Sequence, residues 1–171
     1  KSFEDIVSDD EVKVVVETMG GIHPAFEFVS RCLEAGKSVV TSNKELIAWK
    51  GYELMKIAYE HGALLEFEAS VGGGIPVIRA MSDCLNSNKI ISVAGIVNGT
   101  TNFILTKMIE DGESYESALR TAQELGYAEK DPSADVKGLD AGRKLCILCT
   151  VKAHNCCAKC VNSINTLCAN I

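Results

Sequence analysis

The first part of the chain alternates between short β-branched runs and helical patterns, and this alternation limits the fold more than any other feature. Strands are predicted at residues 12–17, 37–41 and 63–69, and helices at 24–36 and 43–62. Parallel strands need long crossover connections, which the intervening helices supply. The order strand, helix, strand, helix, strand therefore predicts a parallel α/β sheet with right-handed crossovers.

Local signals mark where these helices begin and end. Pro24 stands in the first turn of the first helix, where its missing N–H is not needed, and Gly36 is the predicted stop. The second helix has Asn43 as a candidate N-cap and ends at Gly62. The run VKVVVE at residues 12–17 is predicted to be a buried strand.

The pattern changes after Pro76, where a second, α+β unit is predicted. Residues 76–85 and 114–126 are predicted helices, and KIISVAGIV at 89–97 is a predicted strand. The helix at 114–126 has Ser114 as a candidate N-cap and Gly126 as a candidate C-terminal glycine. NGTT at 98–101 leads into another helix, most simply as a turn with an N-cap. The alternative is that this turn contacts a ligand.

Ligands of parallel α/β sheets bind beyond the carboxyl ends of the strands. Here those ends are residues 18–21, 41–44 and 68–74, so we expect a crevice lined by three loops. Lys44 either donates to a carbonyl or phosphate in this crevice or is a solvated lysine after a helix cap.

The loop EASVGGGIPV (68–77) leaves several kinds of site open. Amides pointing inward would bind an anion at a helix start, whereas carbonyls beside Glu68 would bind a hard cation. It is not a G-x-G-x-x-G fingerprint, because Val77 stands where the third glycine belongs, and a plain tight turn is also possible.

The stretch GYAEKDPSADVKGLDAGRK (126–144) places charges on a predicted helix that contains Gly138 and Gly142. Asp140 and Lys144 are four residues apart and share a helix face. Each helix-interior glycine costs about 1 kcal/mol relative to alanine, which suggests close packing on the glycine side of the helix.

Glu129 and Asp135 can complete a cluster with Asp140 and Lys144. A lysine among carboxylates can deliver a proton while the carboxylates bind an amino group. The alternative is a solvated helix start, where acidic side chains favour the helix dipole.

Composition argues against several classes of partner. The 171 residues carry a net charge of −6 and no basic stripe, which disfavours nucleic acid and anionic membranes. No apolar run reaches the roughly 18–20 residues of a membrane span, and no signal peptide is recognised. The chain begins at Lys1 and not at Met, which hints at a partial sequence.

Six of the eight cysteines lie in the C-terminal part of the chain. A secreted disulfide scaffold would spread them evenly, so a reducing cytoplasm is predicted. The pairs Cys146-x-x-Cys149 and Cys157-x-x-Cys160, with His154 between them, superficially resemble zinc knuckles. The alternative for Cys146 and Cys149 is packing as small apolar residues on a helix.

Five segments, in order, resemble homoserine dehydrogenase: VVVETMGGIHPA, GKSVVTSNKELIA, FEASVGGGIPVI, GIVNGTTNFILTKM and AQELGYAEKDPSADVKGLDAGRKL. The resemblance covers roughly residues 10–149, and its last segment is the most specific. That family reduces L-aspartate 4-semialdehyde to L-homoserine with NADPH or NADH, on the route to threonine and methionine.

The resemblance implies roles for single residues. Lys144 would donate the proton to the aldehyde oxygen, and Lys44 would line the active-site cleft near cofactor and substrate. Glu129 and Asp140 would bind the amino-acid part of the substrate, with Asp135 supporting the cluster.

Cofactor and ion sites are implied in the same way. Thr18, Lys44 and Gly126 would lie near the NAD or NADP dinucleotide. The implied sodium ion would be held by Glu68 and the carbonyls of Val71, Gly73 and Ile75.

The implied architecture is a partial Rossmann-like NAD(P)-binding domain at residues 1–76, part of an α+β catalytic domain at 77–150, and a Cys-rich tail of unknown role at 151–171. A cytoplasmic homodimer is expected. The family's first strand, its glycine-rich dinucleotide turn and its usual continuation after GRKL are not recognised here. The alternative is therefore an inactive fragment that binds substrate or a partner but not the dinucleotide.

Overall fold

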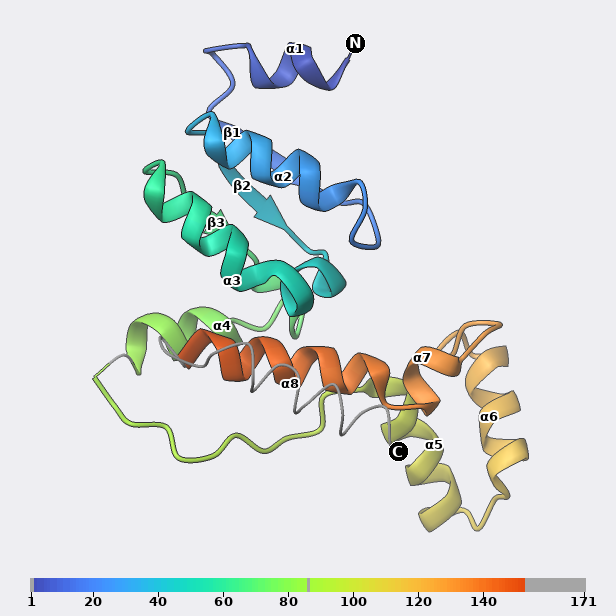
Figure 1. Cartoon of the computed structure of the whole chain (residues 1–171). Coiled ribbons are helices and arrows are strands. Elements are labelled where there is room, and N and C mark those ends of the chain that lie inside the picture. The colour runs from blue at the N-terminus through green and yellow to red at the C-terminus, as the bar shows by residue number, and fades with distance from the viewer. Residues whose placement is uncertain (1, 86, 153–171) are drawn as a thin grey trace. The chain divides into compact units, whose positions relative to one another are not determined.

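The structure is a computed structural model that describes residues 2–85 and 87–152. These residues fall into two compact units. The first unit holds the residues up to Ile90 together with the last helix from Cys146 onward, and the second holds Ile91–Leu145. Figure 1 labels the helices and strands of both units.

The first unit contains the predicted parallel sheet. Strands β1 (Val14–Glu17), β2 (Ser38–Thr41) and β3 (Leu65–Glu66) pair in parallel in the order β1-β2-β3. Helix α2 (Ala25–Glu34) connects the first two strands and α3 (Lys44–Glu60) connects the second pair (Figure 1). The alternation of strand and helix predicted from the sequence is confirmed.

Both connecting helices cover the same face of this sheet. The register places Val15, Val39 and Leu65 in one row across the three strands, and all three pack against side chains of α2 and α3. Val39 is fully buried, as is Leu33 of α2. This row forms the core of the first unit.

The opposite face carries the row Val16, Val40 and Glu66, and all three side chains are exposed. Val16 is 67% exposed and Val14 is 57% exposed, so the prediction of a buried strand at residues 12–17 is wrong. A β-branched run fits any pleated surface, and its burial depends on what packs against each face. The described residues leave this face of β1 largely exposed.

The short helix α1 (Phe3–Val7), which was not predicted from the sequence, packs on α2. The ring of Phe3 stacks on Phe28 with 4.2 Å between centroids. Arg31 donates to both carboxylate oxygens of Glu4, at 2.6 and 2.7 Å, and this hydrogen bonding lowers the pKa of Glu4.

The chain leaves the sheet earlier than predicted. After the two-residue strand β3, a 3₁₀ turn η1 (Glu68–Ser70) begins the glycine-rich loop. Helix α4 (Val77–Arg79) continues as a π-helical segment η2 (Ala80–Cys84). The helix predicted at residues 76–85 is therefore confirmed, with Pro76 as its N-cap residue.

The strand predicted at residues 89–97 is absent, since this described segment has no regular secondary structure. Ile91 is 92% exposed and Ile96 is 79% exposed. A strand forms only where a neighbouring strand accepts its backbone hydrogen bonds, and no described strand pairs with it. β-Branched composition alone was misleading here.

The second unit is helical in its described part. It contains α5 (Gly99–Glu110), α6 (Tyr115–Glu124), α7 (Ser133–Val136) and most of α8 (Leu139–Lys152). Its core is small: Ile104, Ala118, Ala122 and Ala128 are buried together.

Three predicted helix signals hold in the structure. Asn43 accepts a hydrogen bond from the Leu46 N–H, and Ser114 accepts one from the Ser117 N–H. Gly126 ends α6 with a φ of 78°. Each is a residue type that satisfies helix-terminal backbone groups or adopts the left-handed conformation.

None of the helices in the described part of the chain is long and apolar enough to span a membrane.

Candidate functional site

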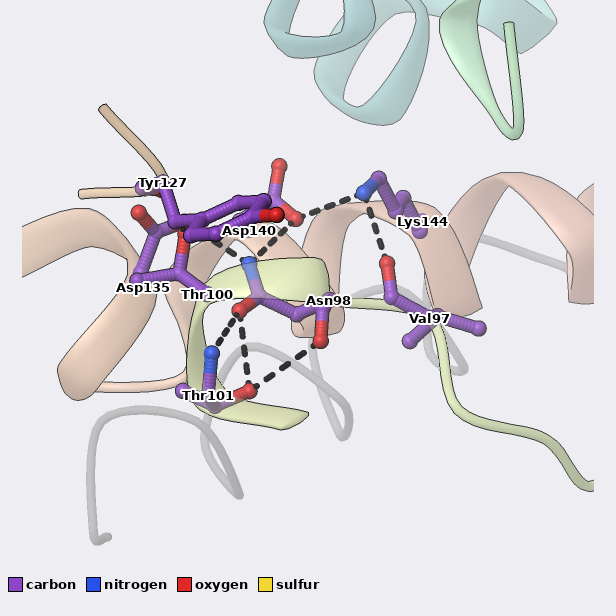
Figure 2. A network of polar contacts seen from close by, with 8 residues as sticks. All are labelled: Val97, Asn98, Thr100, Thr101, Tyr127, Asp135, Asp140 and Lys144. Carbon is purple, nitrogen blue, oxygen red and sulfur yellow. Dashed lines mark hydrogen bonds and ion pairs between the residues drawn. The ribbon is translucent and has the colours of Figure 1, made fainter. Parts of the chain in front are cut away.

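A network of polar side chains joins the start of α5 to α7 and α8 within the second unit (Figure 2). Asn98 lies at its centre. Its Nδ2 donates to Asp135 Oδ1 at 2.7 Å and to Asp140 Oδ2 at 3.0 Å. Asn98 is 7% exposed and Asp140 is 8% exposed. Burying a carboxylate is unfavourable unless it is hydrogen-bonded. The Asn98 amide gives one hydrogen bond to each of the two carboxylates.

Lys144 completes the network. Its Nζ donates to Asp140 Oδ2 at 2.8 Å and to the carbonyl of Val97 at 2.6 Å. The two side chains of the ion pair are only 18% and 11% exposed. The pair therefore differs from a solvated helix pair, which contributes about 0.3–0.5 kcal/mol. The prediction that Asp140 and Lys144 share one helix face is confirmed.

Gly138 has a different role from the one expected. It lies between α7 and α8 with a φ of 73°, and so it is not a helix-interior residue. Apart from its two chain neighbours, no heavy atom of the described residues lies within 4 Å of a Cβ placed on Gly138. The close packing expected on its side is therefore wrong. Glycine is needed for the turn after which α8 begins at Leu139, one residue before Asp140.

Replacing Gly138 with alanine is expected to lower the free energy of unfolding by about 1–2 kcal/mol, because an L-residue in the left-handed region is strained. Gly95→Ala is the control, since Gly95 has no positive φ and open space around its Cα; its effect should stay within about 0.5 kcal/mol. Urea unfolding followed by circular dichroism measures both. Equal losses in the two variants would contradict this account of the α7–α8 turn.

Glu129 lies apart from the network. Its side chain is exposed and makes no hydrogen bond to the network among the described residues, although its carbonyl accepts one from Gln123 Nε2 at 3.2 Å. Nearby, Asp131 accepts hydrogen bonds from the hydroxyl and the N–H of Ser133, which hold its pKa below the usual range. The structure thus brings together three of the four predicted cluster residues.

Asn98 was not predicted as a site residue. The sequence signal NGTT correctly indicated an N-cap, because Asn98 Oδ1 accepts from the N–H and the hydroxyl of Thr101, each at 2.8 Å. Nothing local, however, shows its contacts with residues 37 and 42 positions away. Thr100, in the same turn, also has a distant partner, because its hydroxyl donates to the carbonyl of Tyr127 at 2.6 Å.

A second set of polar residues lies at the carboxyl ends of β1 and β2 in the first unit. The hydroxyl of Thr41 donates to Glu17 and accepts from the Asn43 N–H at 2.9 Å. Asn43 Nδ2 then donates to the carbonyl of Gly21 at 2.7 Å. These buried contacts fix the loop after β1 to the start of α3.

Two predicted cofactor residues flank this set. Lys44 is the first residue of α3 and is partly buried, and Thr18 is exposed directly after β1. Thr18 also lines a mainly apolar cavity of about 410 Å³ beside β1 and α2. The topology therefore brings Thr18 and Lys44 to the same edge of the sheet.

The glycine-rich loop is organised around Glu68. Its two carboxylate oxygens accept hydrogen bonds from the N–H groups of Ile78 and Arg79, at 2.9 and 2.8 Å. The carboxylate therefore caps the start of α4. The carbonyl of Ile75 accepts from the Val77 N–H at 2.8 Å. These two amides belong to α4 and not to the loop itself, so the anion site, the cation site and the plain turn all stay predictions for this loop.

The zinc hypothesis falls mainly outside the described residues, because these do not include His154, Cys157 or Cys160. Within the described part of the chain, no group of three His, Cys, Asp or Glu side chains is placed to hold a metal ion. Cys146 is buried on α8 and its thiol lies 3.6 Å from the carbonyl of Ala48. This agrees with the packing alternative for Cys146.

Two models of protein families match this sequence. One describes the homoserine dehydrogenase NAD binding domain and matches residues 1–68, and the other describes homoserine dehydrogenase and matches residues 76–165. The chain belongs to the homoserine dehydrogenase family. The resemblance expected from five sequence segments is confirmed.

Two bacterial homoserine dehydrogenases illustrate the relationship. The chain is 50% identical over 144 residues to that of Bacillus subtilis, an alignment covering 84% of this chain and 33% of the relative. It is 48% identical over 147 residues to that of Lactococcus lactis, covering 86% and 34%. The chain thus spans about a third of the length of these homoserine dehydrogenases.

Solved homoserine dehydrogenases share the fold. The enzyme from Thiobacillus denitrificans superposes with a TM-score of 0.83 at 46% identity, covering 88% of this chain and 35% of that one. A hyperthermophilic archaeal homoserine dehydrogenase, solved in complex with NADPH, gives a TM-score of 0.81 at 37% identity, covering 89% and 47%. The α/β class with a Rossmann-like first unit is thereby confirmed, and residues 1–68 match the family's NAD binding domain.

Proposed function

We propose that this chain carries the proton-transfer and substrate-binding residues of a homoserine dehydrogenase, which reduces L-aspartate 4-semialdehyde to L-homoserine in threonine and methionine biosynthesis. The observation that carries the proposal is the shielded Lys144–Asp140 pair, bridged by Asn98 to Asp135, in a chain of this family.

Lys144 has the chemistry of a proton donor. A lysine ammonium carries three N–H bonds, and contacts with Asp140 and Val97 use two of them. The third can donate to the aldehyde oxygen of a bound substrate. As the carbonyl carbon is reduced, its oxygen gains negative charge and takes the proton from Lys144. The reduced nicotinamide supplies the hydride when the dinucleotide is bound.

The carboxylates near Lys144 suit the amino group of the substrate. Asp135 uses one oxygen to accept from Asn98, and an ionised carboxylate can accept further hydrogen bonds. We assign the amino-acid part of the substrate to Asp140 and Glu129, with Asp135 in support. Glu129 is exposed in the structure, and this role would require it to accept a hydrogen bond from the substrate itself.

The dinucleotide is assigned to Thr18, Lys44 and Gly126. Thr18 and Lys44 fit this role because they follow neighbouring parallel strands at the edge where α/β sheets bind nucleotides. Lys44 can pair with an anionic group of the cofactor. The loop at Thr18 is exposed, which leaves room for the cofactor next to this loop. The positive φ of Gly126 lets the backbone turn without a side chain that would block a ligand.

For the sodium ion we propose Glu68 and the carbonyls of Val71, Gly73 and Ile75. Sodium, like other hard cations, prefers oxygen ligands, and this loop offers them close together in sequence. The fit is partial, because Glu68 already accepts two backbone hydrogen bonds and must use its remaining lone pairs.

A homodimer in a reducing cytoplasm completes the proposal, and the uneven cysteine distribution supports that compartment.

Turnover by the full 171-residue chain tests the proposed function. We expect loss of NADPH absorbance that depends on aspartate semialdehyde, and NADP reduction that depends on homoserine in the reverse direction. Homoserine binding measured by calorimetry provides a readout that needs no cofactor. No turnover, no homoserine binding and no NADPH binding together would show that this chain is an inactive part of the enzyme.

A further inference from the structure

We propose that Asn98 is a positioning residue, which sets the places of Asp135 and Asp140 and, through Asp140, of the Lys144 ammonium. This role rests on the proposed function and deepens it. Asn98 itself would touch neither the reacting aldehyde nor the cofactor. Its effect is exerted through the hydrogen bonds that it gives to the two carboxylates (Figure 2).

Chemistry fixes the orientation of the Asn98 amide. Its Oδ1 faces the backbone N–H of Thr101, which can only donate. Its Nδ2 faces the carboxylates of Asp135 and Asp140, which accept hydrogen bonds when ionised. A reversed amide would set donor against donor and acceptor against acceptor, so only one orientation satisfies every partner.

This combination of contacts requires asparagine. Two carboxylates within hydrogen-bond distance of one nitrogen repel each other, and a neutral amide offers each of them one N–H while its oxygen caps α5. Serine could cap the helix but has a single O–H to donate. Aspartate could also cap, but it would add a third negative charge to the pair.

The main chain next to Asn98 also helps to hold the Asp140–Lys144 ion pair. Val97 and Asn98 are consecutive, and they hold the two ends of one ion pair: the Val97 carbonyl accepts from Lys144, and the Asn98 amide donates to Asp140. Because Asn98 is buried and tied to the first turn of α5, the pair has little freedom to shift. Misplacing a reacting group by 1 Å can lower a rate about 100-fold.

Asn98→Ser and Asn98→Asp in the full chain test this role, because both retain an N-cap and both remove the bridge. We expect kcat/KM for homoserine oxidation to fall about 10- to 100-fold in Asn98→Ser, mainly in kcat. In Asn98→Asp, three carboxylates lie close together, and their mutual repulsion favours the protonated forms. The pH profile of kcat/KM should therefore also move to higher pH. The measurements are steady-state kinetics across pH, homoserine calorimetry and thermal unfolding.

Ser114→Ala is the matched control, since Ser114 caps α6 and lies outside the network. It should lower the unfolding midpoint by roughly 2–4 °C and leave kcat/KM unchanged. If Asn98→Ser keeps the parent's kcat/KM and pH profile, Asn98 is only a helix cap and the inference is overturned. If the parent neither turns over nor binds homoserine, it is the proposed function that fails, and the inference falls with it.

Discussion

Replacing Lys144 with methionine is expected to lower kcat for aldehyde reduction by about 100- to 10,000-fold, the usual contribution of a general acid. Methionine keeps an unbranched stem in the site but has no proton to give. The variant also leaves Asp140 with fewer partners in a place that is 8% exposed, so we expect a loss of about 1–3 kcal/mol in unfolding free energy. Stopped-flow NADPH absorbance and urea unfolding measure the two effects.

Lys144→Arg separates charge from proton transfer. A guanidinium keeps its proton throughout the accessible pH range and still pairs with a carboxylate. We therefore expect this variant to regain most of the stability lost by Lys144→Met while its kcat stays low. Turnover at the parent's rate in Lys144→Arg would remove Lys144 from the role of proton donor.

The chain offers a matched control for the methionine substitution. Lys107 of α5 pairs with Asp111, the C-cap residue of that helix four residues later, at 2.6 Å, but both side chains are much more exposed. Lys107→Met should leave kcat unchanged and alter the unfolding free energy by at most about 0.5 kcal/mol. The comparison asks whether the location of a lysine–aspartate pair, and not its spacing, decides its effect.

Features of this fold that depend on neighbours in sequence were predictable. The strand–helix alternation follows from periodicity, and the caps at Asn43 and Ser114 follow from residue type. The shared face of Asp140 and Lys144 follows from helical spacing alone. In each case the interacting groups are close along the chain, so the local pattern contains the required information.

Features that depend on distant partners were missed. Residues 89–97 have strand composition but no described strand beside them, and Val16 lies on a sheet face that the described residues leave largely exposed. Asn98 looked like a cap because its second set of partners lies about 40 residues further on. Gly138 was placed inside a helix because a sequence pattern does not show backbone φ angles.

Neutralising Asp140 is the second substitution with a large expected effect. Asp140→Asn keeps the size of the side chain but removes the charge that pairs with Lys144 and that we assign to the substrate's amino group. Hydrogen bonds to charged groups contribute about 1.5–3 kcal/mol. Homoserine affinity should therefore fall roughly 10- to 150-fold, as measured by calorimetry. Asp111→Asn, at the exposed pair at the end of α5, should leave the affinity unchanged.

A double-mutant cycle on Asp140→Asn and Lys144→Met then measures the pair itself. We expect a coupling free energy of about 1–3 kcal/mol in urea unfolding, because the two side chains are shielded from water and share the Asn98 network. The same cycle on Asp111 and Lys107 should give about 0.3–0.5 kcal/mol. Equal coupling in the two cycles would mean that burial adds nothing to the Asp140–Lys144 pair. The pair would then be held as loosely as a surface ion pair, and it could not fix a proton donor in place.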